Sequence, residues 1–186
     1  LSGISLFPWY PYGCPIKYEF FSNAYDGLLK IISRIKTLAN QINSDYAGKT
    51  LDLVCLVNSA QFFTSDLVKY LTVPTRLHYL GFNSYLKGNE TGEVRLTSDI
   101  QEPLFGRDVL VIEAIVVSGR TPKYIMDLLK NRKPNSLNLC ALGSKPHLLS
   151  EKLPLKYVAF ELGKEILVGY GIGSGPDKTK PFLFSK

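Results

Sequence analysis

Residues 109–121 read Val-Leu-Val-Ile-Glu-Ala-Ile-Val-Val-Ser-Gly-Arg-Thr, and this stretch decides the fold. Its first four residues form the short, continuous apolar run that is typical of a strand buried on both faces of a parallel sheet. Pro122 comes next, and the residues up to Asn131 predict a helix, whose first turn tolerates the proline. A strand, a small polar turn and a helix in this order predict one unit of an α/β sheet.

The same alternation extends along the rest of the chain. Helical spacing of apolar residues predicts helices at 26–44 and 62–71, and apolar runs predict strands at 51–57, 75–82, 137–142, 157–160 and 166–170. A polar stretch with Gly88 and Gly92 interrupts this pattern and ends in the alternating residues 93–96. Since the chain has no internal repeat and no low-complexity linker, we expect one α/β domain over residues 26–186.

Residues 1–25 differ in character and are interpreted as an N-terminal extension. Residues 7–15 read Phe-Pro-Trp-Tyr-Pro-Tyr-Gly-Cys-Pro, and this density of proline prevents a regular helix or a central strand. The segment is too aromatic to remain free in water. Two interpretations stay open: it docks on a larger assembly, or it folds over its own sheet as part of a small hood.

Composition narrows the class of protein. With 186 residues, 45% of them hydrophobic, the chain suits one globular domain, and no apolar run is long enough to span a bilayer. Its net charge of +6 fits either a solvated basic face or an anionic partner. The three cysteines form no CxxC motif and no cluster with either histidine, so we expect no metal site and a reducing compartment.

The turn at Ser118, Gly119, Arg120 and Thr121 has the features of a phosphate cradle. Ligands of open α/β sheets bind beyond the carboxyl ends of the strands, and backbone N–H groups at a helix start favour anions. Two hydroxyls and a glycine suit such a site, although many turns between a strand and a helix look like this for purely structural reasons.

These residues resemble the type I phosphoribosyltransferases, whose buried strand ends in two acidic residues, two apolar residues and Asp-Thr-Gly-Lys/Arg-Thr. The resemblance extends from about residue 26 over most of the chain. Residues 53–63 resemble the family strand that ends in Leu-Lys-Gly-Gly, and residues 83–85 with 91–94 are similar to the mobile loop of the hypoxanthine-guanine branch. Residues 157–161 and 168–171 resemble that branch's C-terminal motifs. The resemblance implies a parallel-sheet, Rossmann-like core with a small hood formed by the chain ends.

Several family residues with catalytic roles are replaced. Glu113 keeps one of the two acidic residues that bind the ribose hydroxyls and support magnesium, but Ala114 replaces the other. Val117 stands where the family has the aspartate that acts near purine N7 as a general acid or base, and valine has no proton to exchange. The Lys-Gly pair that approaches pyrophosphate becomes Val57 and Asn58.

The position near the family's second magnesium is matched by a cation, Lys164. The resemblance therefore implies no catalytic residue and no bound metal, with magnesium expected only if the chain is active.

Part of the nucleotide pocket is retained. The resemblance assigns nucleotide binding to Glu113 and to the four residues of the turn at 118–121. It also matches Lys145 with the lysine that contacts purine O6, Tyr157 with the aromatic that stacks on the base, and Val158 with the residue whose backbone reads the base edge. For Lys145 a surface position, and for Tyr157 a position in the core, are equally open interpretations.

From these losses we expect a catalytically inactive phosphoribosyltransferase-like protein. It would serve as an accessory subunit of a larger assembly, respiratory or ribosomal, in the mitochondrion or otherwise in the cytoplasm, and would hold GMP, IMP or another purine nucleotide. Two alternatives stay open. The first is an active purine salvage enzyme that converts hypoxanthine or guanine and phosphoribosyl pyrophosphate to IMP or GMP, and the second is a nucleotide-sensing regulator.

Overall fold

Seven strands form the central sheet of the part of the chain described by the computed structural model, which comprises residues 16–17, 24–57, 59–85 and 93–185. Their spatial order is β1-β7-β6-β5-β2-β3-β4. The strands are β1 (Ile16–Lys17), β2 (Leu51–Val57), β3 (Thr75–Tyr85), β4 (Glu93–Ser98), β5 (Asp108–Val116), β6 (Ser136–Ser144) and β7 (Leu155–Glu161). All neighbours pair in parallel except β3 and β4, which confirms the predicted parallel α/β core.

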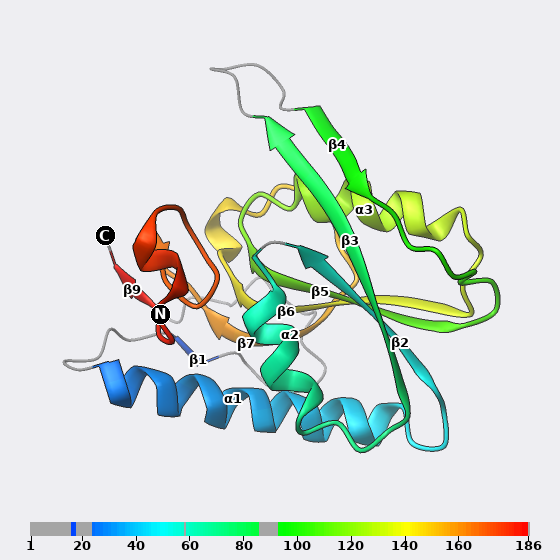
Figure 1. Ribbon diagram of the computed structural model, residues 1–186, viewed down its shortest axis with the longest axis horizontal. Coiled ribbons are helices and arrows are strands. Elements are labelled where there is room, and N and C mark those ends of the chain that lie inside the picture. Colours follow the sequence, from blue (N-terminus) through cyan, green and yellow to red (C-terminus); the bar gives the residue numbers. More distant parts are fainter. Residues whose placement is uncertain (1–15, 18–23, 58, 86–92, 186) are drawn as a thin grey trace, which may run out of the picture.

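Helices cover both faces of this sheet (Figure 1). On one face lie α1 (Ala24–Asp45) and α2 (Gln61–Val68), and on the other lies α3 (Arg120–Lys130). The side chains of β2 alternate between the two resulting cores: Leu53 and Cys55 pack toward α1 and α2, whereas Val54 and Leu56 pack toward the α3 side. Because both faces are buried, the strand reads as a continuous apolar run in the sequence.

The C-terminal segment forms a small second sheet beside the first. Its antiparallel strands are β8 (Leu167–Val168) and β9 (Phe184–Ser185), with the 3-10 turn η2 (Pro176–Thr179) between them, whereas the 3-10 turn η1 (Pro146–Leu148) lies between β6 and β7. The strand expected at 166–170 is shorter, because the backbone φ angles at residues 169–171 are all positive and turn the chain there. Tyr170 packs edge-on against Phe62, and its hydroxyl donates to Asp66, so this segment is fastened to α2.

Of the N-terminal extension, the structure describes Ile16 and Lys17 and the last two residues, 24–25, which begin α1. Ile16 and Lys17 pair with Phe160 and Glu161 at the outer edge of the main sheet. The aromatic and proline-rich stretch at 7–15 lies outside the described residues, as do Asn58 and the loop at 86–92. The docking role predicted for the extension, and the mobile-loop match, are therefore left as predictions.

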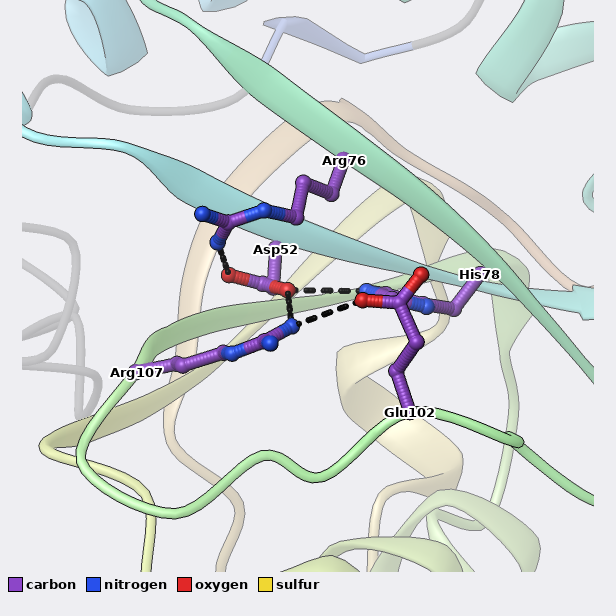
Figure 2. Close-up of polar contacts among 5 residues, drawn as sticks. All are labelled: Asp52, Arg76, His78, Glu102 and Arg107. Atoms are coloured by element: carbon purple, nitrogen blue, oxygen red, sulfur yellow. Dashed lines mark hydrogen bonds and ion pairs between the residues drawn. The ribbon is translucent and has the colours of Figure 1, made fainter.

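A buried carboxylate joins the amino-terminal ends of three neighbouring chain segments (Figure 2). Asp52, the second residue of β2, is fully buried. Its Oδ1 lies 2.8 Å from Nε2 of His78 and accepts a hydrogen bond of 3.0 Å from Arg107, while its Oδ2 accepts one of 3.1 Å from Arg76. Arg107 also donates to Glu102 at 3.1 Å. The free-energy cost of burying this charge is offset, because every partner supplies a hydrogen bond as well as charge or polarity.

Replacement of this carboxylate tests how far the fold depends on it. We expect Asp52→Asn to lower the free energy of unfolding by about 3 kcal/mol, because it removes the negative charge shared by the surrounding groups and replaces one acceptor oxygen by an NH₂ donor. Urea denaturation measures the change. The matched control is Asp127→Asn, which removes an exposed ion pair with Lys123 on α3 and is expected to change stability by less than about 1 kcal/mol. Equal losses in the two variants would contradict a stabilising role for the Asp52 cluster.

Candidate active site

The carboxyl ends of β2, β5, β6 and β7 meet at one edge of the sheet, as parallel pairing requires. The N–H of Lys145, just beyond β6, donates to the carbonyl of Val116 at the end of β5 over 2.9 Å. The N–H of Leu162, just beyond β7, donates in the same way to Ser144 over 2.8 Å. This edge therefore gathers residues from four segments that are far apart in the sequence, and it is where an open α/β sheet binds its ligand.

Glu113 is the buried acid of this edge, and only 6% of it is exposed. Its Oε1 accepts two hydrogen bonds, one of 2.7 Å from the N–H of Ala114 and one of 3.2 Å from the hydroxyl of Ser59. Burial raises the pKa of the carboxyl to about 7, and the two hydrogen bonds partly offset that rise. Near neutral pH this group therefore exists in both protonation states.

The turn after β5 is shaped as an anion cradle. Gly119 precedes the first residue of α3 with a φ of 85°, and a side chain there would collide with Leu149, Glu151 and Leu153. Glycine is therefore required for the turn. The hydroxyl of Ser118 accepts from the N–H of Arg120 at 3.4 Å.

The first residues of α3 place hydrogen-bond donors at the start of the helix. The Arg120 side chain is exposed and that of Thr121 is half-buried. Backbone N–H groups at the start of α3, with a hydroxyl and a guanidinium beside them, suit a phosphate.

Lys145 approaches the same edge from β6. It is only 8% exposed, and its ammonium group donates a hydrogen bond of 2.5 Å to the backbone carbonyl of Glu165. The next residue, Ile166, is 69% exposed. An exposed apolar side chain beside a buried lysine offers one polar and one apolar contact to a planar ligand. The sequence alone did not indicate Ile166, because its neighbour Glu165 meets Lys145 only through a contact between positions 20 residues apart.

The structure places the ring of Tyr157 in the core, whereas the base contact expected of the Val158 backbone stays a prediction. Both residues lie inside β7, opposite Cys140 and Ala141 of β6. The ring of Tyr157 is 1% exposed and belongs to the core beneath α1, where its hydroxyl donates a hydrogen bond of 2.6 Å to Asp45. Between the two interpretations left open by the sequence, the structure places Tyr157 in the core.

The replaced family positions fall at or near the same edge. Val117 is 42% exposed at the mouth of the cradle, whereas Ala114 is buried against the core beneath α1 and α2. Val57 is half-buried at the end of β2, and Lys164 is exposed in the turn after β7. Within the described residues, no three potential metal ligands lie together.

A parallel sheet with a buried carboxyl, a lysine and a glycine turn before a helix at its carboxyl edge is typical of α/β proteins that hold a phosphorylated ligand. The sequence identifies the family. The profile described as "Phosphoribosyl transferase domain" matches residues 23–174, and the chain belongs to this family.

Relatives of the hypoxanthine-guanine type are similar over most of their length. The hypoxanthine-guanine phosphoribosyltransferase of Streptococcus thermophilus is 34% identical over 143 residues, which cover 76% of this chain and 79% of that enzyme. The one of Dictyostelium discoideum is 36% identical over 148 residues, covering 77% and 82%. A crystal structure of the hypoxanthine phosphoribosyltransferase of Staphylococcus aureus superposes with a TM-score of 0.81 at 31% identity and covers 90% of this chain and 96% of that one.

These relatives correct the expectation of an inactive accessory subunit. Relatives with 33–37% identity bear the name of a working transferase, in bacteria and in a eukaryote alike. No respiratory, ribosomal or mitochondrial protein is among those reported above. The expectation gave too much weight to a few substituted positions and too little to the similarity of the whole chain.

None of the helices in the described part of the chain combines the length and the apolar character needed to cross a bilayer.

The buried acid makes the stability of the protein depend on pH. Because the pKa of Glu113 is about 7 in the folded protein and near 4.5 when exposed, the folded state binds more protons between these values. Its contribution to stability is therefore lost as pH rises from 4.5 to 7, by up to about 3 kcal/mol. Denaturant titrations of the wild type and of Glu113→Gln, which cannot ionise, give this contribution as their difference. Parallel pH profiles for the two proteins would contradict the shifted pKa.

Proposed function

We propose that this chain transfers the phosphoribosyl group of phosphoribosyl pyrophosphate to hypoxanthine or guanine. The observation that carries the proposal is the 33–37% identity, over about three quarters of each chain, to relatives named hypoxanthine-guanine phosphoribosyltransferase. The geometry of the carboxyl edge supports it, because a cradle for phosphate, an acid for sugar hydroxyls and a lysine for a purine oxygen lie on adjacent strands.

Each part of the substrate has a partner at this edge. The turn at 118–121 receives the 5′-phosphate through backbone N–H groups and the Arg120 guanidinium. Glu113 accepts hydrogen bonds from the ribose hydroxyls. Lys145 donates to the purine oxygen, and Ile166 covers one face of the ring, the role that the sequence alone assigned to Tyr157.

The reaction forms a bond between a purine nitrogen and C1′ and breaks the bond between C1′ and the pyrophosphate oxygen. The proton released by the purine has to leave the ring. Val117 cannot take it, but this side chain is 42% exposed, so water reaches the mouth of the cradle and takes the proton. General acid–base catalysis contributes about 10²–10⁴-fold to a rate. We therefore expect this chain to be slower, by a part of this factor, than an enzyme with a proton acceptor at position 117.

In this reaction we expect magnesium to bind together with the substrate and not at a separate protein site. The described residues form no metal centre of three ligands, but Mg²⁺ in phosphate sites is held by one or two carboxylates together with substrate oxygens. Glu113 supplies one such carboxylate, and the exposed cation Lys164 supplies none. When bound with pyrophosphate, the ion would neutralise the charge that develops on the leaving group.

Turnover by the purified protein tests the proposal. With guanine or hypoxanthine, phosphoribosyl pyrophosphate and Mg²⁺, we expect equal amounts of nucleoside monophosphate and pyrophosphate, separated by chromatography. Val117→Asp is expected to raise kcat by about 10²-fold, since it restores a proton acceptor, and Glu113→Gln to lower kcat/KM. The control Asp127→Asn, on the exposed face of α3, should leave the rate unchanged. Failure of the wild type to exceed the uncatalysed rate would contradict the proposal.

The assignment of the base contact is tested by a pair of variants. Ile166→Ala removes an exposed side chain, so we expect about tenfold weaker binding of GMP with unchanged stability. Tyr157→Leu removes a buried ring and its hydrogen bond to Asp45, so we expect a loss of about 2–4 kcal/mol in stability with unchanged GMP affinity. Calorimetry and urea denaturation measure the two quantities. The opposite pattern would return the stacking role to Tyr157.

A further inference from the structure

The two oxygens of the Glu113 carboxyl have unequal surroundings. Oε1 accepts both hydrogen bonds, from the N–H of Ala114 at 2.7 Å and from the hydroxyl of Ser59 at 3.2 Å. Oε2 accepts none from the residues that the structure describes. Within the same residues every fully buried side-chain oxygen has a partner, so Oε2 keeps access to solvent. One oxygen of the acid is thus fixed by the protein, and the other remains ready for a ligand.

Ser59 is itself held from two directions. It follows β2, where the N–H of Ala60 donates to the carbonyl of Leu56 over 3.2 Å. From the other side the C-terminal segment packs against its carbonyl: a Cβ at Gly171, where φ is 86°, would lie 2.9 Å from that oxygen. Only glycine permits this approach. Two neighbouring contacts therefore restrict the backbone around Ser59, and its hydroxyl donates to Glu113 from this position.

A fixed Oε1 determines how the carboxyl can meet a sugar. A carboxylate bonded on one side presents its second oxygen in one direction, where a hydroxyl of a ribose ring donates a short, charge-assisted hydrogen bond. Without the hydroxyl of Ser59 the carboxyl keeps only the bond to Ala114 and is free to rotate. Pre-organisation of an acceptor in this way strengthens binding, because less ordering is needed when the ligand arrives.

We propose that Ser59 is a positioning residue: it holds Oε1 of Glu113, so that Oε2 accepts a hydrogen bond from a ribose hydroxyl of the nucleotide. This inference rests on the proposed function for the identity of the ligand, but it concerns binding and needs no turnover. Ser59 thereby makes the site prefer a sugar that carries hydroxyl groups. This role could not be predicted from the sequence, because residue 59 lies 54 positions from its partner.

The test compares two ligands and four proteins by calorimetry of the full chain. The ligands are GMP and its 2′,3′-dideoxy form, which lacks both sugar hydroxyls. The proteins are the wild type, Ser59→Ala, Ser59→Thr and the control Ser65→Ala, which changes an exposed serine of α2. We expect Ser59→Ala to weaken GMP binding about tenfold, as loss of a hydrogen bond to a charged group does. Ser59→Thr should restore most of the affinity, and Ser65→Ala should change nothing.

The dideoxy ligand separates positioning from mere structural support. Because it cannot donate to Oε2, its affinity should be the same in the wild type and in Ser59→Ala. A loss of equal size for both ligands would overturn the inference, as would failure of the wild type to bind GMP. If GMP binding depends on Ser59 while no turnover is found, the proposed function fails and the positioning role stands.

Discussion

Parallel pairing of β5 with a neighbour on each side is the constraint on which the site depends. Cys55 of β2 lies opposite Ile112, and Ala141 of β6 lies opposite Glu113, so the three strands end together. A shift of one residue in either register would turn Glu113 toward the opposite face of the sheet. Apolar packing on both faces fixes the register, because nearly every residue of these strands is buried. The position of the acid is thus a consequence of core packing several residues away.

Much of this architecture was predictable from the sequence. The strand expected at 51–57 has these bounds in the structure, and the helix expected at 26–44 extends over Ala24–Asp45. Such elements are predictable because apolar periodicity directly records which faces are buried. The expected strand at 166–170 was too long, since the sequence does not reveal that Tyr170 adopts a φ of 52°. Its edge contact with Phe62, more than 100 residues earlier, accompanies this backbone conformation.

The site was only partly predictable. The strand and turn that carry Glu113 and Gly119 are continuous in sequence, so a motif identifies them. Tyr157 could not be assigned in this way, because an aromatic residue in a strand suits a core and a pocket equally well. Its hydrogen bond to Asp45, on a helix 112 positions earlier, decides for the core. Ser59 and Ile166 were missed for the same reason: their neighbours are distant in the chain.

The Asp52 cluster lies at the end of the sheet opposite the ligand edge, and this separation affects which substitutions the fold tolerates during evolution. Its five residues connect β2, β3 and the segment before β5 through hydrogen bonds and ion pairs, without using any residue of the nucleotide site. Stability secured at one end leaves the other end free to exchange acids for alanine or valine, as at Ala114 and Val117, without loss of the fold. The fold is therefore robust to mutation because of the Asp52 cluster, and the ligand site at the opposite edge can evolve.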